Sequence, residues 1–261
     1  MAGKAPGYAQ HADYRLTLEP CAKRLRVVFG GETIADTTAA RLCHETRHLP
    51  VYYFPRADVR MDLLTPTARQ THCPFKGDAS YWTVAAGGRG AADAVWSYDD
   101  PYDEASAFAD HMAFYWDRMD AWFEEDEEVF VHARDPYARI DVIASTRPVR
   151  VVAGGEVLAA TTRALFLFET GLPVRYYIPR EDVRMDRLTA TDKTTRCPYK
   201  GTATYWSLTG GDPAFEDIVW SYPDPLAEVG RLKDYLCVFN ERADEITVDG
   251  VAVARPVTQW S

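Results

Sequence analysis

Two cysteines begin the same short motif at two places in the chain. Cys73 starts Cys-Pro-Phe-Lys-Gly, and Cys197 starts Cys-Pro-Tyr-Lys-Gly. A lysine ammonium beside a thiol favours the thiolate, which is the nucleophilic form of cysteine. One interpretation is a catalytic thiol at Cys73 and Cys197, activated by Lys76 and Lys200. The other is a small apolar side chain packed at a turn.

A thiol nucleophile usually works with a general base, most often histidine. His72 precedes Cys73, but Arg196 precedes Cys197, and all six histidines lie before the second repeat, the last being His132. The two motifs therefore share no Cys–His dyad.

Residues 44–48 read His-Glu-Thr-Arg-His and match the H-E-x-x-H signature of zinc metalloproteases. That chemistry needs both histidines on one face of a helix. Here the segment leads into Leu49-Pro50 and the β-rich residues 51–54, and the matching stretch 168–172 keeps only Glu-Thr. Phosphate-binding glycine loops are also missing from the sequence. We therefore expect no metal and no cofactor, and we give Glu45 and Glu169 another role.

The chain repeats itself after 124 residues without a gap. Asp-Val-Arg-Met-Asp at 58–62 returns at 182–186, and Trp-Ser-Tyr at 96–98 returns at 220–222. Solenoid repeats run ~20–50 residues, so this longer period indicates two domains.

We predict a first domain at 12–124, a connector at 125–136 and a second domain at 137–254. The connector is short and acidic, which is typical of a solvated edge. We expect the two halves to pack together as a pseudo-dimer, like a fused homodimer.

The residue pattern predicts a mainly β fold in each repeat. Residues 25–29 and 32–37 form a hairpin around Gly30-Gly31, residues 51–54 and 81–84 are further strands, and 245–248 is a closing strand. Cys-Pro-x-Lys-Gly is a tight turn, because its glycine is free to adopt positive φ.

One helix per repeat is predicted after Pro101 and Pro225, since proline suits the first turn of a helix. The apolar residues that follow recur at helical spacing. They are Ala105, Phe108, Met112 and Tyr115 in the first repeat and Val229, Leu232, Leu236 and Phe239 in the second.

Residues that a shared mechanism needs should occur in both copies. Several recurring pairs combine charged groups with aromatic rings, which is typical of sites for small planar ligands. We predict one pocket per repeat, with arginine and lysine as anion anchors and glutamate as acceptor. The residues are Glu45, Tyr53, Arg60 and Lys76, repeated as Glu169, Tyr177, Arg184 and Lys200. The alternative is that these charged pairs only hold strands together.

Composition excludes several classes of function. The chain has a net charge of −10, which disfavours binding to nucleic acid and to anionic membranes. No stretch approaches the ~20 apolar residues of a membrane span. The first residues lack the apolar core of a signal peptide, and the five cysteines form no disulfide or zinc pattern. We expect a cytoplasmic protein.

The recurring motifs together resemble domain-of-unknown-function family 427, which is sometimes labelled nucleotidyltransferase-type. They are Glu-Thr, Tyr-Tyr-x-Pro-Arg-x-Asp-Val-Arg-Met-Asp, Thr-x-Cys-Pro-x-Lys-Gly, Tyr-Trp and Trp-Ser-Tyr, and both repeats carry them. The resemblance implies a β-tent-like fold, as in methionine-R-sulfoxide reductase B, Yippee proteins and the thalidomide-binding domain of cereblon. Some of these proteins bind ligands in an aromatic cage. By this similarity the cage would consist of Trp82, Trp96 and Tyr98, and of Trp206, Trp220 and Tyr222.

Three hypotheses about function follow. The first is a small-molecule-binding protein whose ligand is planar and possibly anionic or nucleotide-like. The second is a cysteine-dependent enzyme that uses Cys73 and Cys197. The third is a structural or protein-interaction module.

Overall fold

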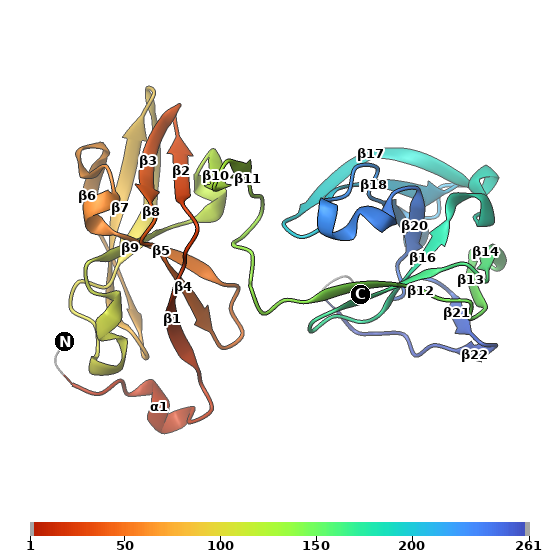
Figure 1. Ribbon diagram of the computed structural model, residues 1–261, viewed down its shortest axis with the longest axis horizontal. Helices are drawn as coiled ribbons and strands as arrows, with labels where there is room; N and C mark the ends of the chain where they lie inside the picture. Colours follow the sequence, from red (N-terminus) through yellow and green to blue (C-terminus); the bar gives the residue numbers. More distant parts are fainter. Residues whose placement is uncertain (1–2, 259–261) are drawn as a thin grey trace. The chain divides into compact units, whose positions relative to one another are not determined.

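The chain folds into two similar β-rich units (Figure 1). The computed structural model describes residues 3–258, and unit 1 ends at Arg134 where unit 2 begins at Asp135. Each unit contains one seven-stranded and one four-stranded sheet, so the mainly β prediction is confirmed. The helices within residues 3–258 are all too short or too polar to span a membrane.

All neighbouring strands of unit 1 are antiparallel. The seven-stranded sheet has the order β1 (Leu16–Pro20), β4 (Arg41–Glu45), β5 (Val51–Pro55), β9 (His111–Phe114), β8 (Arg89–Ser97), β7 (Gly77–Ala86) and β6 (Leu64–Cys73). The four-stranded sheet has the order β11 (Glu127–Glu128), β10 (Ala121–Glu124), β2 (Leu25–Phe29) and β3 (Glu32–Thr37). The helices are α1 (Gly7–Gln10) and the 3-10 helices η1 (Arg56–Asp58), η2 (Met61–Leu63), η3 (Asp103–Phe108) and η4 (Trp116–Arg118).

Unit 2 repeats this arrangement. Its seven-stranded sheet has the order β12 (Ile140–Ala144), β15 (Leu165–Glu169), β16 (Arg175–Pro179), β20 (Tyr235–Val238), β19 (Val219–Ser221), β18 (Gly201–Leu208) and β17 (Leu188–Cys197). Its four-stranded sheet has the order β14 (Glu156–Thr161), β13 (Val149–Ala153), β21 (Glu245–Val248) and β22 (Val251–Ala252). The 3-10 helices are η5 (Arg180–Asp182), η6 (Met185–Arg187), η7 (Pro213–Phe215) and η8 (Ala227–Leu232).

The predicted hairpin joins β2 to β3 in unit 1. Gly30 and Gly31 have φ of 60° and 81°, a left-handed conformation that a two-residue turn between strands requires. The corresponding turn in unit 2 uses Gly154 and Gly155, with φ of 64° and 75°. The predicted closing strand is β21, whose bounds match the prediction.

The predicted helix after Pro101 and Pro225 is much shorter than the apolar spacing indicates. In unit 1 the 3-10 helix η3 ends at Phe108, the chain turns at Asp110 with φ of 61°, and Met112 lies in strand β9. Unit 2 repeats this with Asp234 at φ of 68° and Leu236 in β20. A short helix followed by a strand buries the same apolar residues that a longer helix would bury. The spacing alone therefore did not distinguish the two.

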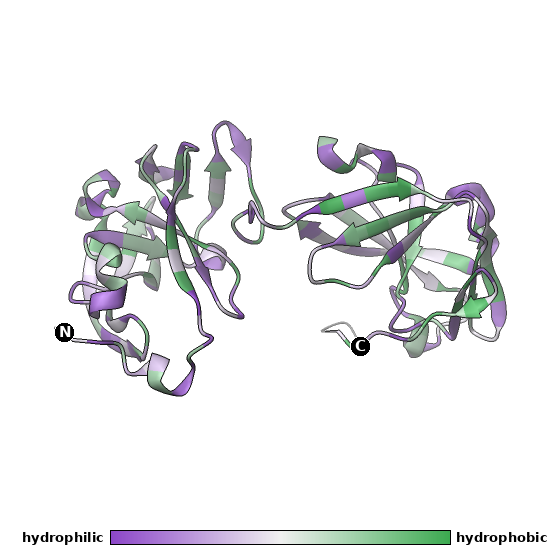
Figure 2. Cartoon of the chain, turned by 60° about the horizontal axis from the view of Figure 1, so that its bottom comes forward, coloured by the Kyte–Doolittle hydropathy of each residue, from purple (hydrophilic) through white to green (hydrophobic). Residues whose placement is uncertain are grey.

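The central strands of the seven-stranded sheet are buried on both faces. Because side chains alternate along a strand, Phe54 of β5 packs in the core between the two sheets while Tyr53 points to the opposite face. That opposite face is covered by η3 in unit 1 and by η8 in unit 2, and we call it the helix-covered face. In unit 1 it is formed by Cys43, Tyr53, Ala79, Tyr81, Tyr98, Ala105, Phe108 and Ala113. Figure 2 shows hydrophobic stretches along the strands of both units.

Candidate functional site

A buried ion pair recurs in both units at the helix-covered face. Lys76 Nζ lies 2.5 Å from Glu45 Oε2, with side-chain exposures of 8% and 13%. Lys200 Nζ lies 2.6 Å from Glu169 Oε2, with exposures of 10% and 11%. Removing two charges from water is unfavourable unless they pair closely. The same pair at the same place in both units is therefore a specific feature of this fold.

The elements that place the pair are a strand end and a tight turn. Glu45 is the last residue of β4, and Lys76 lies in the turn between β6 and β7. The Lys76 backbone N–H donates to the Cys73 carbonyl at 3.3 Å, and Gly77 has φ of 107°, as this turn requires. Lys200, Cys197 and Gly201 form the same turn in unit 2. The predicted turn at Cys-Pro-x-Lys-Gly is confirmed.

Aromatic rings surround the ion pair. The Lys76 ammonium lies 5.5 Å from the ring centroid of Tyr98 and 6.0 Å from that of Phe108, which is cation–π distance. Trp96 Nε1 donates to Tyr53 Oη at 3.2 Å. The corresponding bond in unit 2, from Trp220 to Tyr177, measures 3.1 Å.

The two candidate thiols lie at the edge of this group. Cys73 and Cys197 are half-buried and pack against the helix-covered face. Burial raises the pKa of Tyr98, and neighbouring Cys73 and Glu45 raise it further. Glu45 and Tyr98 both lie beside the Lys76 ammonium, and Cys73 packs against the cluster that contains Tyr98.

The carboxyl of Glu45 is held as the anion. Burial by itself raises its pKa, but the Lys76 ammonium and the Tyr14 hydroxyl outweigh burial, so that the pKa of Glu45 is lowered. Tyr14 Oη donates to Glu45 Oε1 at 2.5 Å, and its ring stacks on Phe75 at 3.6 Å. Tyr14 thereby closes this end of the face in unit 1. Its position in unit 2 is Ala138, which has no hydroxyl to donate.

The structure brings together only part of the predicted set. The residues at the helix-covered face are Glu45, Tyr53, Cys73, Lys76, Trp96 and Tyr98 in unit 1, and Glu169, Tyr177, Cys197, Lys200, Trp220 and Tyr222 in unit 2.

Trp82 and Trp206 do not belong to this group. Trp82 follows Tyr81 along β7, so the two side chains point to opposite faces of the sheet. Trp82 packs in the core between the sheets, with the Arg56 guanidinium 5.1 Å from its ring centroid. Trp206 lies in the same way under Arg180, at 5.5 Å. The predicted cage of three aromatic residues is therefore not formed.

Arg60 and Arg184 also lie elsewhere. Arg60 lies between η1 and η2, and Arg184 lies between η5 and η6. Each makes a two-pronged bond to an aspartate two residues on, with distances of 2.7 and 2.8 Å to Asp62 and to Asp186. These are exposed ion pairs, and neither arginine belongs to the helix-covered face beside Lys76 or Lys200. The structure therefore does not group Arg60 with Lys76, or Arg184 with Lys200, as the repeat predicted.

The His-Glu-Thr-Arg-His segment is not helical. His44 and Glu45 end strand β4, and His48 follows in a turn, so that the two histidines are not on one helical face. Across residues 3–258 no group of three or more histidine, cysteine or acidic side chains is placed to hold a metal ion. His72 Nδ1 lies 2.6 Å from Asp78 Oδ1.

A family model described as a domain of unknown function, DUF427, matches residues 17–125 and again residues 141–249. The chain belongs to the DUF427 family. No curated protein matches it. Each match contains one of the buried Glu–Lys pairs of this DUF427 protein, whereas Tyr14 and Ala138 lie outside both matches.

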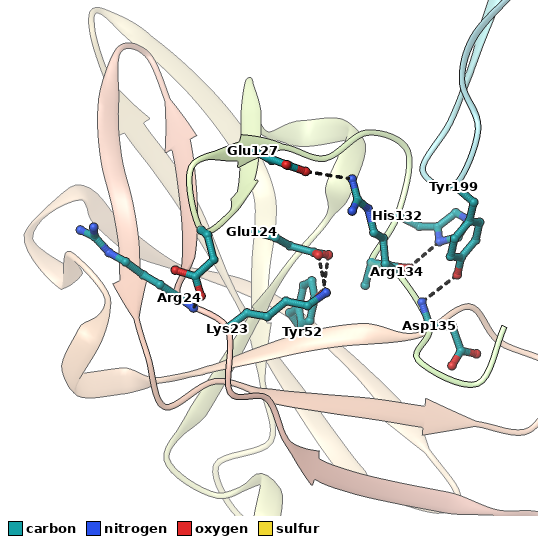
Figure 3. A network of polar contacts seen from close by, with 11 residues as sticks. Lys23, Arg24, Tyr52, Glu124, Glu127, His132, Arg134, Asp135 and Tyr199 are labelled. Carbon is teal, nitrogen blue, oxygen red and sulfur yellow. Dashed lines mark hydrogen bonds and ion pairs between the residues drawn. The ribbon is translucent and has the colours of Figure 1, made fainter. Parts of the chain in front are cut away.

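Comparison of the repeats missed polar residues that occur in only one of them. Tyr14 has no counterpart, so the requirement for recurrence removed it. Unit 1 of the DUF427 protein also buries Glu124, which accepts from Tyr52 Oη at 2.7 Å and pairs with Lys23 (Figure 3).

Unit 2 has a different buried pair. The Arg175 guanidinium donates to both Glu241 oxygens, at 2.6 and 2.7 Å. Val51 and Asp117 stand at these two positions in unit 1, and the repeat carries no signal for the pair.

Proposed function

We propose that each repeat of this DUF427 protein binds a small planar molecule with a polar or anionic end at the helix-covered face, and that it does so in the cytoplasm. The single observation that carries the proposal is that a buried Glu–Lys pair recurs in both units. In each unit it lies near an equivalent tyrosine, Tyr98 or Tyr222, and at the same Cys-Pro-x-Lys-Gly turn. The five cysteines are all free, which fits a reducing compartment.

The chemistry of the pair suits a ligand with both a donor and an acceptor. A lysine ammonium has three N–H donors, and Glu45 accepts from Lys76 through one oxygen only. An anionic ligand group would bond to the remaining donors of Lys76. A ligand donor would bond to the carboxylate. In unit 1 the Tyr14 hydroxyl already occupies the second oxygen of Glu45.

The planar part of the ligand is proposed from the aromatic rim. Trp96 and Tyr115 are half-buried, and their ring centroids lie 4.6 Å apart. In unit 2 Trp220 and Phe239 repeat the contact at 4.5 Å. Aromatic rings stack on planar ligands through their faces and edges.

Native mass spectrometry of the freshly purified full chain tests the proposal. We expect extra mass at one or two metabolite molecules per chain, and loss of one molecule when the Lys200–Glu169 charges are removed. The variant should be Glu169→Gln with Lys200→Met, because a lone buried charge would destabilise the fold. Arg184→Ala is the matched control, since this exposed arginine lies outside the site.

Two results would overturn the proposal. One is a purified chain that carries no extra mass and whose tryptophan fluorescence does not change when metabolites are added. The other is bound mass that survives in the double variants of both units. Cys73→Ser with Cys197→Ser should retain the bound mass, because binding as proposed needs no thiol chemistry.

A further inference from the structure

A surface hollow of about 550 Å³ lies at one end of the four-stranded sheet of unit 2. Its volume is within the ~300–1,000 Å³ typical of small-molecule sites. It lies where β13 begins and where β14 and β21 end. Its walls include Pro148, Arg150, Ala160, Arg163, Asp182 and Thr247.

The hollow follows from a row of paired residues across three strands. Arg150 of β13 is paired with Ala160 of β14 on one side and with Thr247 of β21 on the other. The alanine and the threonine are short, so space remains on both sides of the arginine.

The same row in unit 1 carries larger side chains. Arg26 is paired there with Asp36 on one side and Phe123 on the other. Arg24 makes a two-pronged bond to Asp36 at 2.8 and 2.6 Å, and the Arg26 guanidinium lies 4.8 Å from the ring centroid of Phe123. In unit 1 the row is therefore occupied by two contacting pairs, Arg24 with Asp36 and Arg26 with Phe123.

Unit 2 has replaced three of these four residues and added a cation. Pro148, Ala160 and Thr247 stand where unit 1 has Arg24, Asp36 and Phe123. Arg163 stands where unit 1 has Ala39. The changes remove the side chains that occupied the row and leave two guanidinium groups in the wall.

The ion pairs of the two arginines leave donors for a ligand. Arg150 Nη1 is 3.4 Å from Glu245 Oε1, and Arg163 bonds to Asp182 at 2.8 Å and to Glu181 at 3.2 Å. A guanidinium has five N–H donors, and exposed pairs of this kind are weak. An oxyanion can therefore bind to both arginines without breaking a strong contact.

We propose that this hollow is a second binding site, present only in unit 2, for a small organic oxyanion. Its carboxylate or phosphate group would bond to Arg150 and Arg163, because guanidinium matches the geometry of both. Its apolar part would pack on the exposed ring of Pro148, which also lines the hollow. The site is independent of the Glu–Lys pairs and does not rest on the function proposed for them.

The test is an NMR titration of the isotopically labelled full chain with two probes, benzoate and phenyl phosphate. We expect saturable shifts of the backbone amides of residues 149–150, 160–163 and 247–250, and none at the matching residues of unit 1. A response to one probe alone identifies the anionic group, and a response to both supports a general oxyanion site.

Variants that restore unit 1 residues provide the strictest test. Ala160→Asp with Thr247→Phe refills the row, and Arg163→Ala removes the added cation. Each should weaken binding about tenfold or more, since a hydrogen bond to a charged group is lost or the space is filled. Both changes introduce residues that unit 1 already carries at these places, so the fold should tolerate them. Arg139→Ala is the control, because Arg139 is an exposed cation paired with Asp141 outside the hollow.

Absence of saturable shifts with both probes overturns the proposal. Undiminished binding after the row is refilled also overturns it, because the anion would then be bound elsewhere. A loss of binding in the unit 2 Glu–Lys double variant would show that the two sites are not independent, and would contradict the proposal as stated.

Discussion

The sharpest prediction concerns the two buried ion pairs when their lysines are removed. Lys200→Met leaves Glu169 buried without its cation, and the loss of one partner of such a pair costs about 3–5 kcal/mol. The pair is 10% and 11% exposed, so some solvent screening remains and the lower end of this range applies. We therefore expect unit 2 to lose about 3 kcal/mol of unfolding free energy.

The matching change in unit 1 should cost less. After Lys76→Met, Glu45 still accepts the Tyr14 hydroxyl at 2.5 Å. A hydrogen bond to a charged group contributes about 1.5–3 kcal/mol, and part of the penalty is therefore relieved. We expect the loss in unit 1 to be about 1–2 kcal/mol smaller than in unit 2. Adding Tyr14→Phe to Lys76→Met should remove this difference.

Peptide-resolved hydrogen exchange in urea measures the two units separately in the full chain. Variants that remove both charges, such as Glu169→Gln with Lys200→Met, should lie within about 1 kcal/mol of the natural chain, because no buried charge is left alone. Equal losses in the two units, or a loss in unit 2 below about 1 kcal/mol, would refute the reasoning.

The pH dependence of unit 1 gives an internal check. The pKa of Glu45 is lowered from its usual value of 4.5 in the folded chain. The unfolded state therefore binds the proton more readily, and the stability contributed by Glu45 is present above pH 4.5 and lost on acidification. Lys76→Met should abolish this loss of stability on acidification, because burial, which raises the pKa of Glu45, is then opposed mainly by the Tyr14 hydroxyl.

Two further predictions concern buried tyrosines and turn glycines. Burial raises the pKa of Tyr53 and Tyr177 well above 10.0, so the unfolded state releases these protons first and stability should fall as pH rises above that value. Ultraviolet absorbance should show both phenols ionising only as the chain unfolds, and ionisation of a folded chain would contradict this. Gly30→Ala should destabilise unit 1 by more than the ~1–3 kcal/mol of left-handed strain, because its Cβ would lie 2.3 Å from the Ala86 carbonyl oxygen. Gly154→Ala has the same strain, but its Cβ meets only side chains, a Leu208 methyl at 3.0 Å and the Phe215 ring at 3.9 Å. A larger loss in unit 2 on thermal unfolding would therefore refute the comparison.

The sequence predicted much of the local structure correctly. The glycine pairs predicted the hairpins at 30–31 and 154–155, and the Cys-Pro-x-Lys-Gly motif predicted the turn that holds Lys76. These features depend on backbone conformations that only a few neighbouring residues determine. Because Glu45 and Lys76 recur as Glu169 and Lys200, the sequence also predicted that both have a role.

The helix after Pro101 was predicted less well. Its apolar spacing matched a helix through Tyr115, but the chain turns at Asp110 and enters strand β9. These residues form a strand because there is a place for one between β5 and β8. There residues 112–114 pair with both neighbouring strands and complete the sheet. This place exists only when β5 and β8, which are distant in the sequence, belong to the same sheet.

The sequence by itself therefore determined the duplication, the mainly β class, the turns and the residues that both copies retain. Only the tertiary structure decided which of those residues meet. Glu45 and Lys76 are 31 residues apart and bond because β4 ends beside the β6–β7 turn, whereas adjacent Tyr81 and Trp82 are separated by the sheet itself. The effect of the differences between the two copies also depends on strand order. Ala160 and Thr247 form a hollow only because β13 lies between their strands. Spacing along the chain fixes local geometry, but a binding site depends on strand order and on the face of the sheet to which each side chain points.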